Sequence, residues 1–232
     1  MSGSGFERPI LTVDTVILTL IQGVLHALLV QRTQAPEKDT WTLPGGFVHT
    51  DEDEDAESAA RRVLSTKAGV SVRHLEQLYT FSGKRRDKRG WSASIVYLAL
   101  VQSAEVAEMS TRARWVPVNQ CKNLPFDHTA ILTAGLHRVR DKASYSSLPA
   151  LLLPESFTLS QLQRVYEQVL GVSLNAAAFR RKIETQDLVE LADAPDESGK
   201  SRGRPAQYYR LREDRLVDLG RVLMLPDARR GG

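Results

Sequence analysis

The residues best suited to bind a charged ligand surround a glycine pair in LPGGFV, at residues 43–48. Gly45 and Gly46 carry no side chain, so we expect a turn there whose backbone can approach a ligand closely. Arg32 ends an apolar segment that is expected to face this turn. Guanidinium groups bind diphosphates through paired hydrogen bonds, so this combination favours a pocket for a nucleoside diphosphate.

Two further features could complete such a pocket. The basic loop KRRDKR at residues 84–89 supplies cations, among them Arg85. The alternative for this loop is a solvated hairpin tip. Trp41 could stack on the base of a nucleotide, and its alternative is a place in the hydrophobic core.

The elements that would position these groups follow from hydrophobic patterning. Residues 12–20 and 25–32 are rich in β-branched and apolar residues, and Gln22-Gly23 between them indicates a β-hairpin. Residues 53–67 have a helical apolar rhythm, which Gly69 would end. Three later segments are predicted strands, at residues 72–82, 92–102 and 113–117. The order predicts an α/β fold, with a mixed sheet and a helix after a glycine turn.

The stretch LPGGFV followed by RRVLSTKAGV, at residues 61–70, resembles the Nudix box. That box reads Gly, five residues, Glu, seven residues, then Arg-Glu-apolar-any-Glu-Glu-any-Gly-apolar. The resemblance implies a Nudix-like α/β/α sandwich. Aligned from its right end, the box places its three helical glutamates on Val63, Thr66 and Lys67. This copy also has two extra residues in its loop.

The loss of the glutamates changes the chemistry that this helix face can support. Residues at i, i+3 and i+4 share one face, where three carboxylates would hold divalent cations and activate water. Here the face carries an apolar group, a hydroxyl and an ammonium group, so we predict no catalytic and no metal-binding residues. Lys67 either replaces part of the metal's positive charge, for the fold or for a bound diphosphate, or is a solvent-exposed lysine.

The last third of the chain predicts a second, smaller domain. Residues 124–140 begin with a turn and become a helix, with Asp127 as its N-cap, which would connect the two domains. A capped helix at residues 157–170 that Gly171 stops is followed by a helix at 173–185. Two short strands, at 188–191 and 206–211, then flank a basic loop. This order is typical of a winged helix-turn-helix, whose second helix enters the DNA major groove and whose loop reaches phosphates.

Seven residues are the candidate DNA contacts because they lie on the second helix or in the basic loop. They are Asn175, Arg180, Arg181, Lys182, Lys200, Arg202 and Arg204.

The segments FTLSQLQRVYEQVLG, FRRKI and SRGRPAQYYRL, together with LPFDH at residues 124–128, are similar to the NrtR family of Nudix-related regulators of NAD metabolism. The similarity extends from about residue 10 to about residue 215. It implies a homodimeric repressor that binds a palindromic operator in double-stranded DNA. It further implies ADP-ribose or a related nucleotide as the effector, with no cofactor required. The ligand-binding candidates are then Arg32, Trp41, Gly45, Gly46, Lys67 and Arg85.

Composition sets outer limits. The 232 residues are 42% hydrophobic and 25% charged with one cysteine, which fits a globular protein of the reducing cytoplasm. The apolar runs are too short to span a bilayer, so no membrane partner is expected. We divide the chain into a flexible N-terminus (1–9), a ligand-sensing domain (10–143), a boundary segment (144–154), a winged helix domain (155–215) and a C-terminal tail (216–232).

Two other functions stay open on the sequence alone. The chain could be a Nudix-type hydrolase that uses carboxylates outside the usual box, such as Glu52, Glu54 and Glu57. It could also be a passive nucleotide-binding scaffold. The operator, the regulated genes (NAD synthesis or sugar use) and the sign of the effector's action are not predicted.

Overall fold

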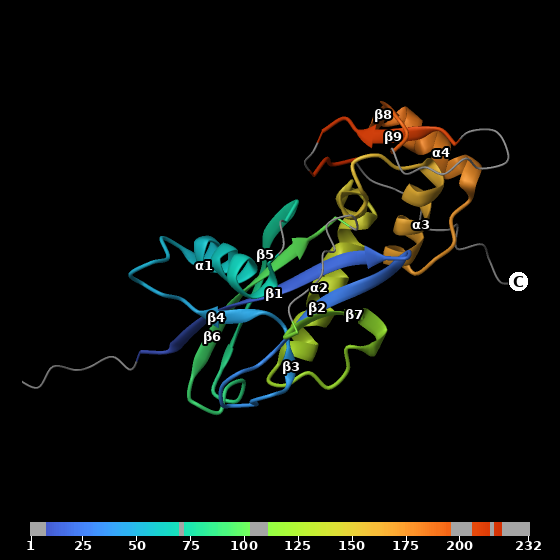
Figure 1. Cartoon of the computed structure of the whole chain (residues 1–232). Helices are drawn as coiled ribbons and strands as arrows, with labels where there is room; N and C mark the ends of the chain where they lie inside the picture. The colour runs from blue at the N-terminus through green and yellow to red at the C-terminus, as the bar shows by residue number, and fades with distance from the viewer. Residues whose placement is uncertain (1–7, 70–71, 103–110, 196–205, 214–215, 220–232) are drawn as a thin grey trace, which may run out of the picture.

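The protein is described by a computed structural model that covers residues 8–69, 72–102, 111–195, 206–213 and 216–219. In this part of the chain a seven-stranded mixed sheet forms the larger layer (Figure 1). Its main path runs β3-β2-β1-β6-β5, while β4 pairs with β1 and β7 pairs with β2. The strands are β1 (Ile10–Ile21), β2 (Val24–Gln31), β3 (Trp41–Thr42), β4 (Gly45–Phe47), β5 (His74–Gly83), β6 (Ser92–Leu100) and β7 (Ala113–Pro117).

The hairpin predicted between the first two strands is confirmed. Gln22 and Gly23 both have positive φ, 50° and 76°, which is the conformation that matches the twist of a two-residue hairpin. Strand β1 lies in the middle of the sheet and pairs in parallel with β6. Its residues from Val13 to Leu20 are all buried, because helices cover both faces of the sheet.

Helix α1 (Ala56–Val63) covers one face of the sheet. Asp55 caps it with a hydrogen bond from the amide of Ser58, so the helix begins later than the predicted residue 53. Its last residues continue into a single π-helical turn, η1 (Leu64–Ala68), which Gly69 ends with a φ of 62°. Val63 packs with Val13 in a small core on this face.

Helix α2 (His128–Ala143) covers the opposite face (Figure 1). Its Gly135 lies so close to β1 that an added Cβ would come within 2.8 Å of Val16. The helix predicted only as a connector is therefore also the second helical layer of the sandwich. Asp127 occupies the N-cap position as expected, but its side chain makes no capping hydrogen bond because Arg86 binds its carboxylate instead.

The predicted glycine turn at Gly45 and Gly46 is wrong. Both residues lie in β4, which pairs antiparallel with β1 through Val13 and Asp14. The glycine is needed here for packing: an added Cβ on Gly45 would lie 1.9 Å from a carboxylate oxygen of Asp14.

The winged helix is confirmed and consists of α3 (Leu159–Leu170), α4 (Ala176–Thr185), β8 (Val189–Ala192) and β9 (Tyr208–Leu211). Thr158 caps α3 in a capping box with Gln161, and Gly171 ends it with a φ of 72°. Tyr166 and Phe179 pack together between the two helices, with ring centroids 5.5 Å apart.

The segment between the two parts is itself buried. Residues 148–152 form a short 3-10 helix, η4 (Leu148–Leu152), and all five residues are buried. Residues 217–219 return to this junction, where the amide of Ser147 donates to Val217 O and the amide of Leu219 donates to Tyr145 O. A hydrophobic core thus continues from the sheet into the winged helix.

Candidate functional site

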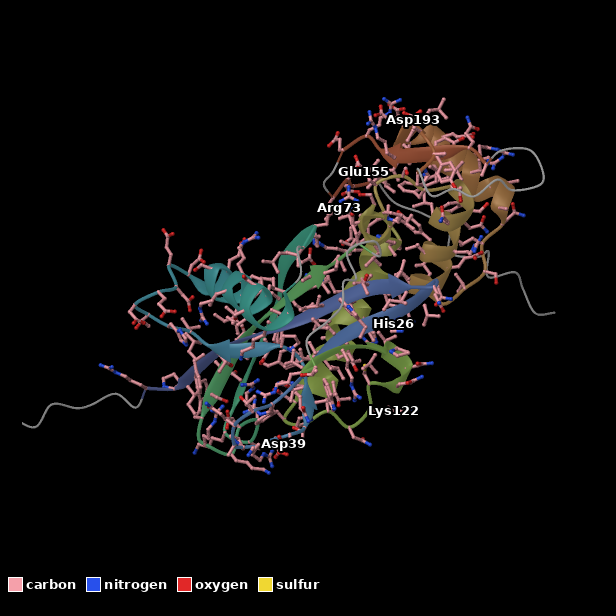
Figure 2. All side chains as sticks on the ribbon, viewed as in Figure 1. His26, Asp39, Arg73, Lys122, Glu155 and Asp193 are labelled. Carbon is pink, nitrogen blue, oxygen red and sulfur yellow. The ribbon has the colours of Figure 1, made fainter. Side chains whose placement is uncertain are left out.

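A cleft of about 550 Å³ opens at one end of the sandwich. This volume lies within the range of pockets that hold nucleotide-sized ligands. Its walls come from β1, the end of β2, β4, the turn η1, the β5–β6 loop and the start of α2. In Figure 2 Asp39, in the loop that follows β2, lies at the opposite end of the molecule from Asp193 of the winged helix.

Positive charge dominates the cleft wall. Six cationic side chains line it, against the two carboxylates of Asp14 and Asp87. The cations are Arg32, Arg62, Lys67, Arg86, Arg89 and Arg112. Three of the six already pair with a carboxylate: Arg62 with Asp53, Arg86 with Asp127 and Arg89 with Asp87. The attraction for an anion therefore comes mainly from Arg32, Lys67 and Arg112, and guanidinium groups favour phosphates above other anions.

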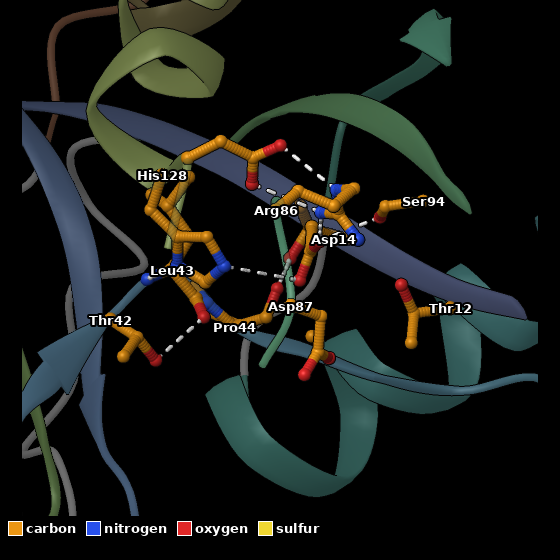
Figure 3. A network of polar contacts seen from close by, with 12 residues as sticks. Thr12, Asp14, Thr42, Leu43, Pro44, Arg86, Asp87, Ser94 and His128 are labelled. Carbon is orange, nitrogen blue, oxygen red and sulfur yellow. Dashed lines mark hydrogen bonds and ion pairs between the residues drawn. The ribbon is translucent and has the colours of Figure 1, made fainter. Parts of the chain in front are cut away.

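A buried polar network forms the floor of the cleft (Figure 3). Asp14 of β1 accepts a 2.6 Å hydrogen bond from the Ser94 hydroxyl and lies 3.5 Å from Arg86. Arg86 also donates two hydrogen bonds, of 2.9 and 3.0 Å, to Asp127. Because the Arg86 side chain is only 8% exposed, this paired geometry is what makes its burial tolerable.

His128 joins the network from the first residue of α2. Its Nδ1 accepts from the amide of Leu43 at 3.1 Å, and its Nε2 lies 3.7 Å from Asp14. Burial lowers the pKa of His128, and this outweighs the opposite effect of the nearby Asp14 carboxylate. The imidazole is therefore neutral at pH 7, with its proton on the nitrogen that faces Asp14.

The helix face that carries glutamates in the Nudix box is rebuilt here from other contacts. Val63 is fully buried in the core, and the Thr66 hydroxyl donates to the carbonyl of Arg62. The Lys67 ammonium group reaches into the cleft and donates to the carbonyl of Gly45. Desolvation there, and then repulsion from Arg32, lower the pKa of Lys67. Lys67 thus places a positive charge beside the cleft, where a metal-binding box would place carboxylates.

Arg62 and Asp53 fix the loop that enters α1. Arg62 donates to both carboxylate oxygens of Asp53 at 2.7 Å and to the carbonyl of Phe47. The hydrogen bonds from Arg62 lower the pKa of Asp53 to about 2. The longer loop of this box is therefore closed by an internal ion pair.

The residues present do not fit the divalent cation that a Nudix box implies. Among the described residues, no group of three or more His, Cys, Asp or Glu is arranged to hold a metal ion. Glu57 pairs with Arg61, and Glu52 contacts His49 at 3.1 Å on an exposed surface. An apolar, a hydroxyl and an ammonium side chain at the box positions offer no ligand set for a hard cation.

Four of the six predicted ligand residues line the cleft: Arg32, Gly45, Gly46 and Lys67. The other two do not. Trp41 packs against the core, with the guanidinium carbon of Arg114 3.9 Å from its ring centroid. Arg85 is exposed on the loop, whereas its neighbour Arg86 turns inward.

Sequence reasoning missed several cleft residues: Asp14, Arg62, Arg89, Arg112, Phe126, His128 and the inward Arg86. The LPFDH segment was a usable signal for two of them, since Phe126 and His128 both line the cleft. For the basic loop no signal existed, because sequence does not reveal which of several adjacent arginines points inward.

Four of the seven DNA-binding candidates lie on α4 or at its N-cap. Arg180 and Arg181 are exposed, and Lys182 is half-buried. Asn175 caps α4 by accepting from the amide of Ala178 at 3.0 Å, so its side-chain oxygen has a structural role. Lys200, Arg202 and Arg204 lie outside the described residues.

The arginines on and next to strand β9 of the winged helix are paired with carboxylates. Arg210 of β9 donates to Glu190 at 2.7 Å, and Arg212 pairs with Asp187 and Glu190. Cations that already have partners attract phosphates less, so the exposed arginines of α4 are the better candidates for DNA contacts.

Comparison with known proteins places both halves. Residues 11–134 match the family model of the NUDIX domain, and residues 149–211 match that of the NrtR DNA-binding winged helix domain. An ADPR responsive transcriptional repressor, NtrR, of Acinetobacter baylyi is 37% identical over 229 residues, which cover 96% of this chain and 90% of that protein.

Two solved structures add to this. Shewanella oneidensis NrtR complexed with a 27mer DNA has a TM-score of 0.76 and 36% identity, and the match covers 87% of this chain and 93% of that one. The NUDIX domain of the same NrtR complexed with ADP ribose has a TM-score of 0.53 and 34% identity, covering 60% of this chain and 93% of that one. In the described part of this chain, no helix is long and apolar enough to cross a membrane.

Proposed function

The chain belongs to the NrtR family of Nudix-related transcriptional regulators, and from this we propose that it is a DNA-binding repressor whose cleft binds ADP-ribose or a related nucleotide as effector. The winged helix binds an operator, and the Nudix-like domain senses the nucleotide. The observation that carries the proposal is the cleft itself, with its six cationic side chains and Lys67 at a former glutamate position.

The cleft suits the diphosphate of ADP-ribose. Arg32 and Lys67 both line the cleft, and after desolvation the repulsion from Arg32 contributes to lowering the pKa of Lys67. A diphosphate between them relieves that repulsion and accepts charge-assisted hydrogen bonds from both. Binding of an anionic ligand is therefore favoured, because it offsets the repulsion between Arg32 and Lys67 in the unliganded protein.

The same geometry supports a binding role without catalysis. Hydrolysis in a Nudix box requires carboxylate-bound cations to activate water. Val63 and Lys67 replace two of those carboxylates, and a lysine ammonium repels the cation. We propose that the domain retains ligand recognition and lacks hydrolase activity.

On the DNA side, the exposed Arg180 and Arg181 present α4 as the recognition helix. Asn175 stands at its N-terminal end, the end that contacts base edges in this motif. Lys200, Arg202 and Arg204 complete the interface through phosphate contacts. The operator is a palindrome read by a homodimer, with half-sites about one or two helical turns apart.

Genes of NAD metabolism are the proposed targets. The test is fluorescence anisotropy of the purified protein on DNA from upstream of its own gene and of neighbouring NAD-synthesis genes, at two salt concentrations, with and without ADP-ribose. Sequence-selective, salt-sensitive binding that ADP-ribose changes is the expected result. Selective DNA binding that ADP-ribose does not change would rule out ADP-ribose as the effector. The absence of selective DNA binding even at low salt would rule out the repressor function.

A matched assay addresses the hydrolase alternative. The protein is incubated with ADP-ribose and magnesium or manganese, and release of AMP is followed. We expect no turnover above the rate without protein. Turnover that Glu52→Gln or Glu54→Gln abolishes would instead support a hydrolase with carboxylates outside the box.

A further inference from the structure

The turn that leads into α2 lies between the cleft and the helix. It consists of residues 124–127 of the LPFDH segment, and Phe126 within it has a φ of 57°. Bulky side chains rarely adopt this left-handed conformation, and when they do the surrounding contacts must hold them there. If those contacts change, the backbone of this turn is therefore expected to change its conformation.

Two arginines from the cleft wall hold this turn. The Arg32 guanidinium lies over the Phe126 ring, 5.0 Å from its centroid. Arg86 grips the Asp127 carboxylate with two hydrogen bonds of 2.9 and 3.0 Å, and a bond to the Ser92 hydroxyl orients it. Both arginines also line the cleft, so an anion that binds there meets the same guanidinium groups that hold the turn.

The opposite end of α2 touches the winged helix. Arg140 donates to the carbonyl of Val169, near the end of α3, at 3.4 Å. The Tyr166 hydroxyl of α3 donates to Ser146 O at 2.9 Å, and the Ser146 hydroxyl donates back to Lys142 O of α2 at 2.7 Å. A helix of 16 residues spans about 24 Å, which connects the cleft floor to the DNA-binding domain.

The C-terminal part of α2 is also tied to the sheet. Glu76 of β5 accepts from Arg138 at 3.0 Å and also from Lys142. A continuous α-helix is stiff over this length, so a displacement of its first turn acts on the contacts that its last turns make with the sheet and with α3. Figure 1 shows α2 extending from the sheet towards α3.

We propose that Arg32 and Arg86 are shared between the effector and this turn, which makes residues 126–127 the relay from the cleft to the winged helix. The diphosphate of a bound nucleotide competes with Phe126 and Asp127 for the two guanidinium groups. The weakened hold on the turn repositions the start of α2, and the helix transmits the change to α3. This relay rests on the proposed effector role of the cleft, and it works only through the ligand's different affinity for the two arrangements.

The test is the full-length variant Asp127→Asn, which removes the competing charge and keeps the side-chain shape. ADP-ribose affinity is measured by calorimetry on the protein alone. DNA affinity is measured by anisotropy with and without saturating ADP-ribose, and the ratio of the two DNA affinities gives the coupling. Asp141→Asn is the matched control, because Asp141 is exposed on the same helix and far from its first turn.

Wild type and Asp141→Asn are expected to share one ratio, in the range of about 5–150-fold that is typical of coupled sites. Asp127→Asn should bind ADP-ribose at least as tightly as wild type and still bind DNA, with a ratio within about twofold of one. A wild-type ratio in Asp127→Asn, or ADP-ribose binding weakened about tenfold, would overturn the relay.

A second variant covers the case in which Asp127→Asn does not fold, as judged by its thermal melt. Phe126→Gly adopts the same φ without strain and removes the ring under Arg32. The relay predicts the same loss of coupling, and an unchanged ratio would contradict it. A wild-type ratio of one would instead refute the effector role itself, so the two failures are distinguishable.

Discussion

The two adjacent glycines of β4 give a sharp test of the site, because the structure assigns them different tolerances. A Cβ added to Gly45 would lie 1.9 Å from Asp14 Oδ1 and 2.9 Å from the carbonyl oxygen of Val13. A Cβ added to Gly46 would meet only Val63 Cγ2, at 3.2 Å, and the flexible Lys67 ammonium, at 3.7 Å. Gly45→Ala and Gly46→Ala are thus a matched pair.

The cost of Gly45→Ala follows from what must move. Asp14 is 6% exposed and cannot turn to solvent, so its carboxylate has to give up the bond from Ser94. Losing a hydrogen bond to a charged group costs ~1.5–3 kcal/mol, and overpacking a closed site costs ~1–3 kcal/mol more. We expect ~3–5 kcal/mol for Gly45→Ala, within the sum of those two ranges. For Gly46→Ala we expect about 1 kcal/mol, because the buried Val63 side chain at 3.2 Å has to shift only slightly.

The assay is urea unfolding followed by circular dichroism, with the thermal midpoint as a second measure. For a chain of 232 residues the expected cost lowers the Tm of Gly45→Ala by about 6–20 °C. ADP-ribose binding should weaken as well, because Asp14 contacts Arg86. Equal stability of the two alanine variants would refute the reasoning, since it would mean that Asp14 does not occupy the space beside Gly45.

Three further predictions concern charge. Burial alone would raise the pKa of Glu76, but hydrogen bonds from His74, Lys142 and Arg138 lower it from 4.5 to about 2. Its contribution to stability, up to ~3 kcal/mol, is therefore present above pH 4.5 and lost as the pH falls towards 2, and Glu76→Gln should flatten the stability-against-pH curve in that window alone. Lys67→Met should weaken ADP-ribose binding about 10–100-fold by calorimetry, with the exposed Lys84→Met as control, and equal affinities would place Lys67 outside the ligand site. Arg181→Ala should reduce discrimination between operator and random DNA about 5–100-fold in competition anisotropy, whereas an unchanged preference would exclude Arg181 from base reading.

Local patterns carried most of the fold. The two-residue hairpin at Gln22-Gly23, the capped start of α3 and the glycines that end η1 and α3 all appear where the sequence predicts them. Each depends on residues within about one helical turn, and such short-range preferences are present in the chain before it folds.

The sequence also shows which chemical groups stand at the positions of the box, but it does not show which other residues line the cleft. The absence of glutamates at Val63, Thr66 and Lys67 is a matter of composition, and it predicts a cleft without metal chemistry whatever the packing. Helical periodicity predicts that Lys67 shares a face with Val63, but its contact with the carbonyl of Gly45 exists only in the folded structure.

What only the tertiary structure decided is which polar groups meet. Leu43 and His128 are 85 positions apart, Arg86 and Asp14 are 72 apart, and no local rule relates them. Arg86 turns inward while Arg85 is exposed, and Arg86 there meets the carboxylates of the buried Asp14 and the partly buried Asp127.

Gly45 and Gly46 show the same difference between what the sequence predicts and what the fold decides. As letters, Gly45 and Gly46 are equivalent, and the sequence predicts a turn for both. The sheet instead points the missing side chain of one towards Asp14 and that of the other towards Val63, because successive residues of a strand face opposite sides. The sequence by itself therefore determined the elements and the chemical character of the cleft. The contacts that make the cleft a site exist only once distant segments are packed together, where burial makes each unpaired charge costly.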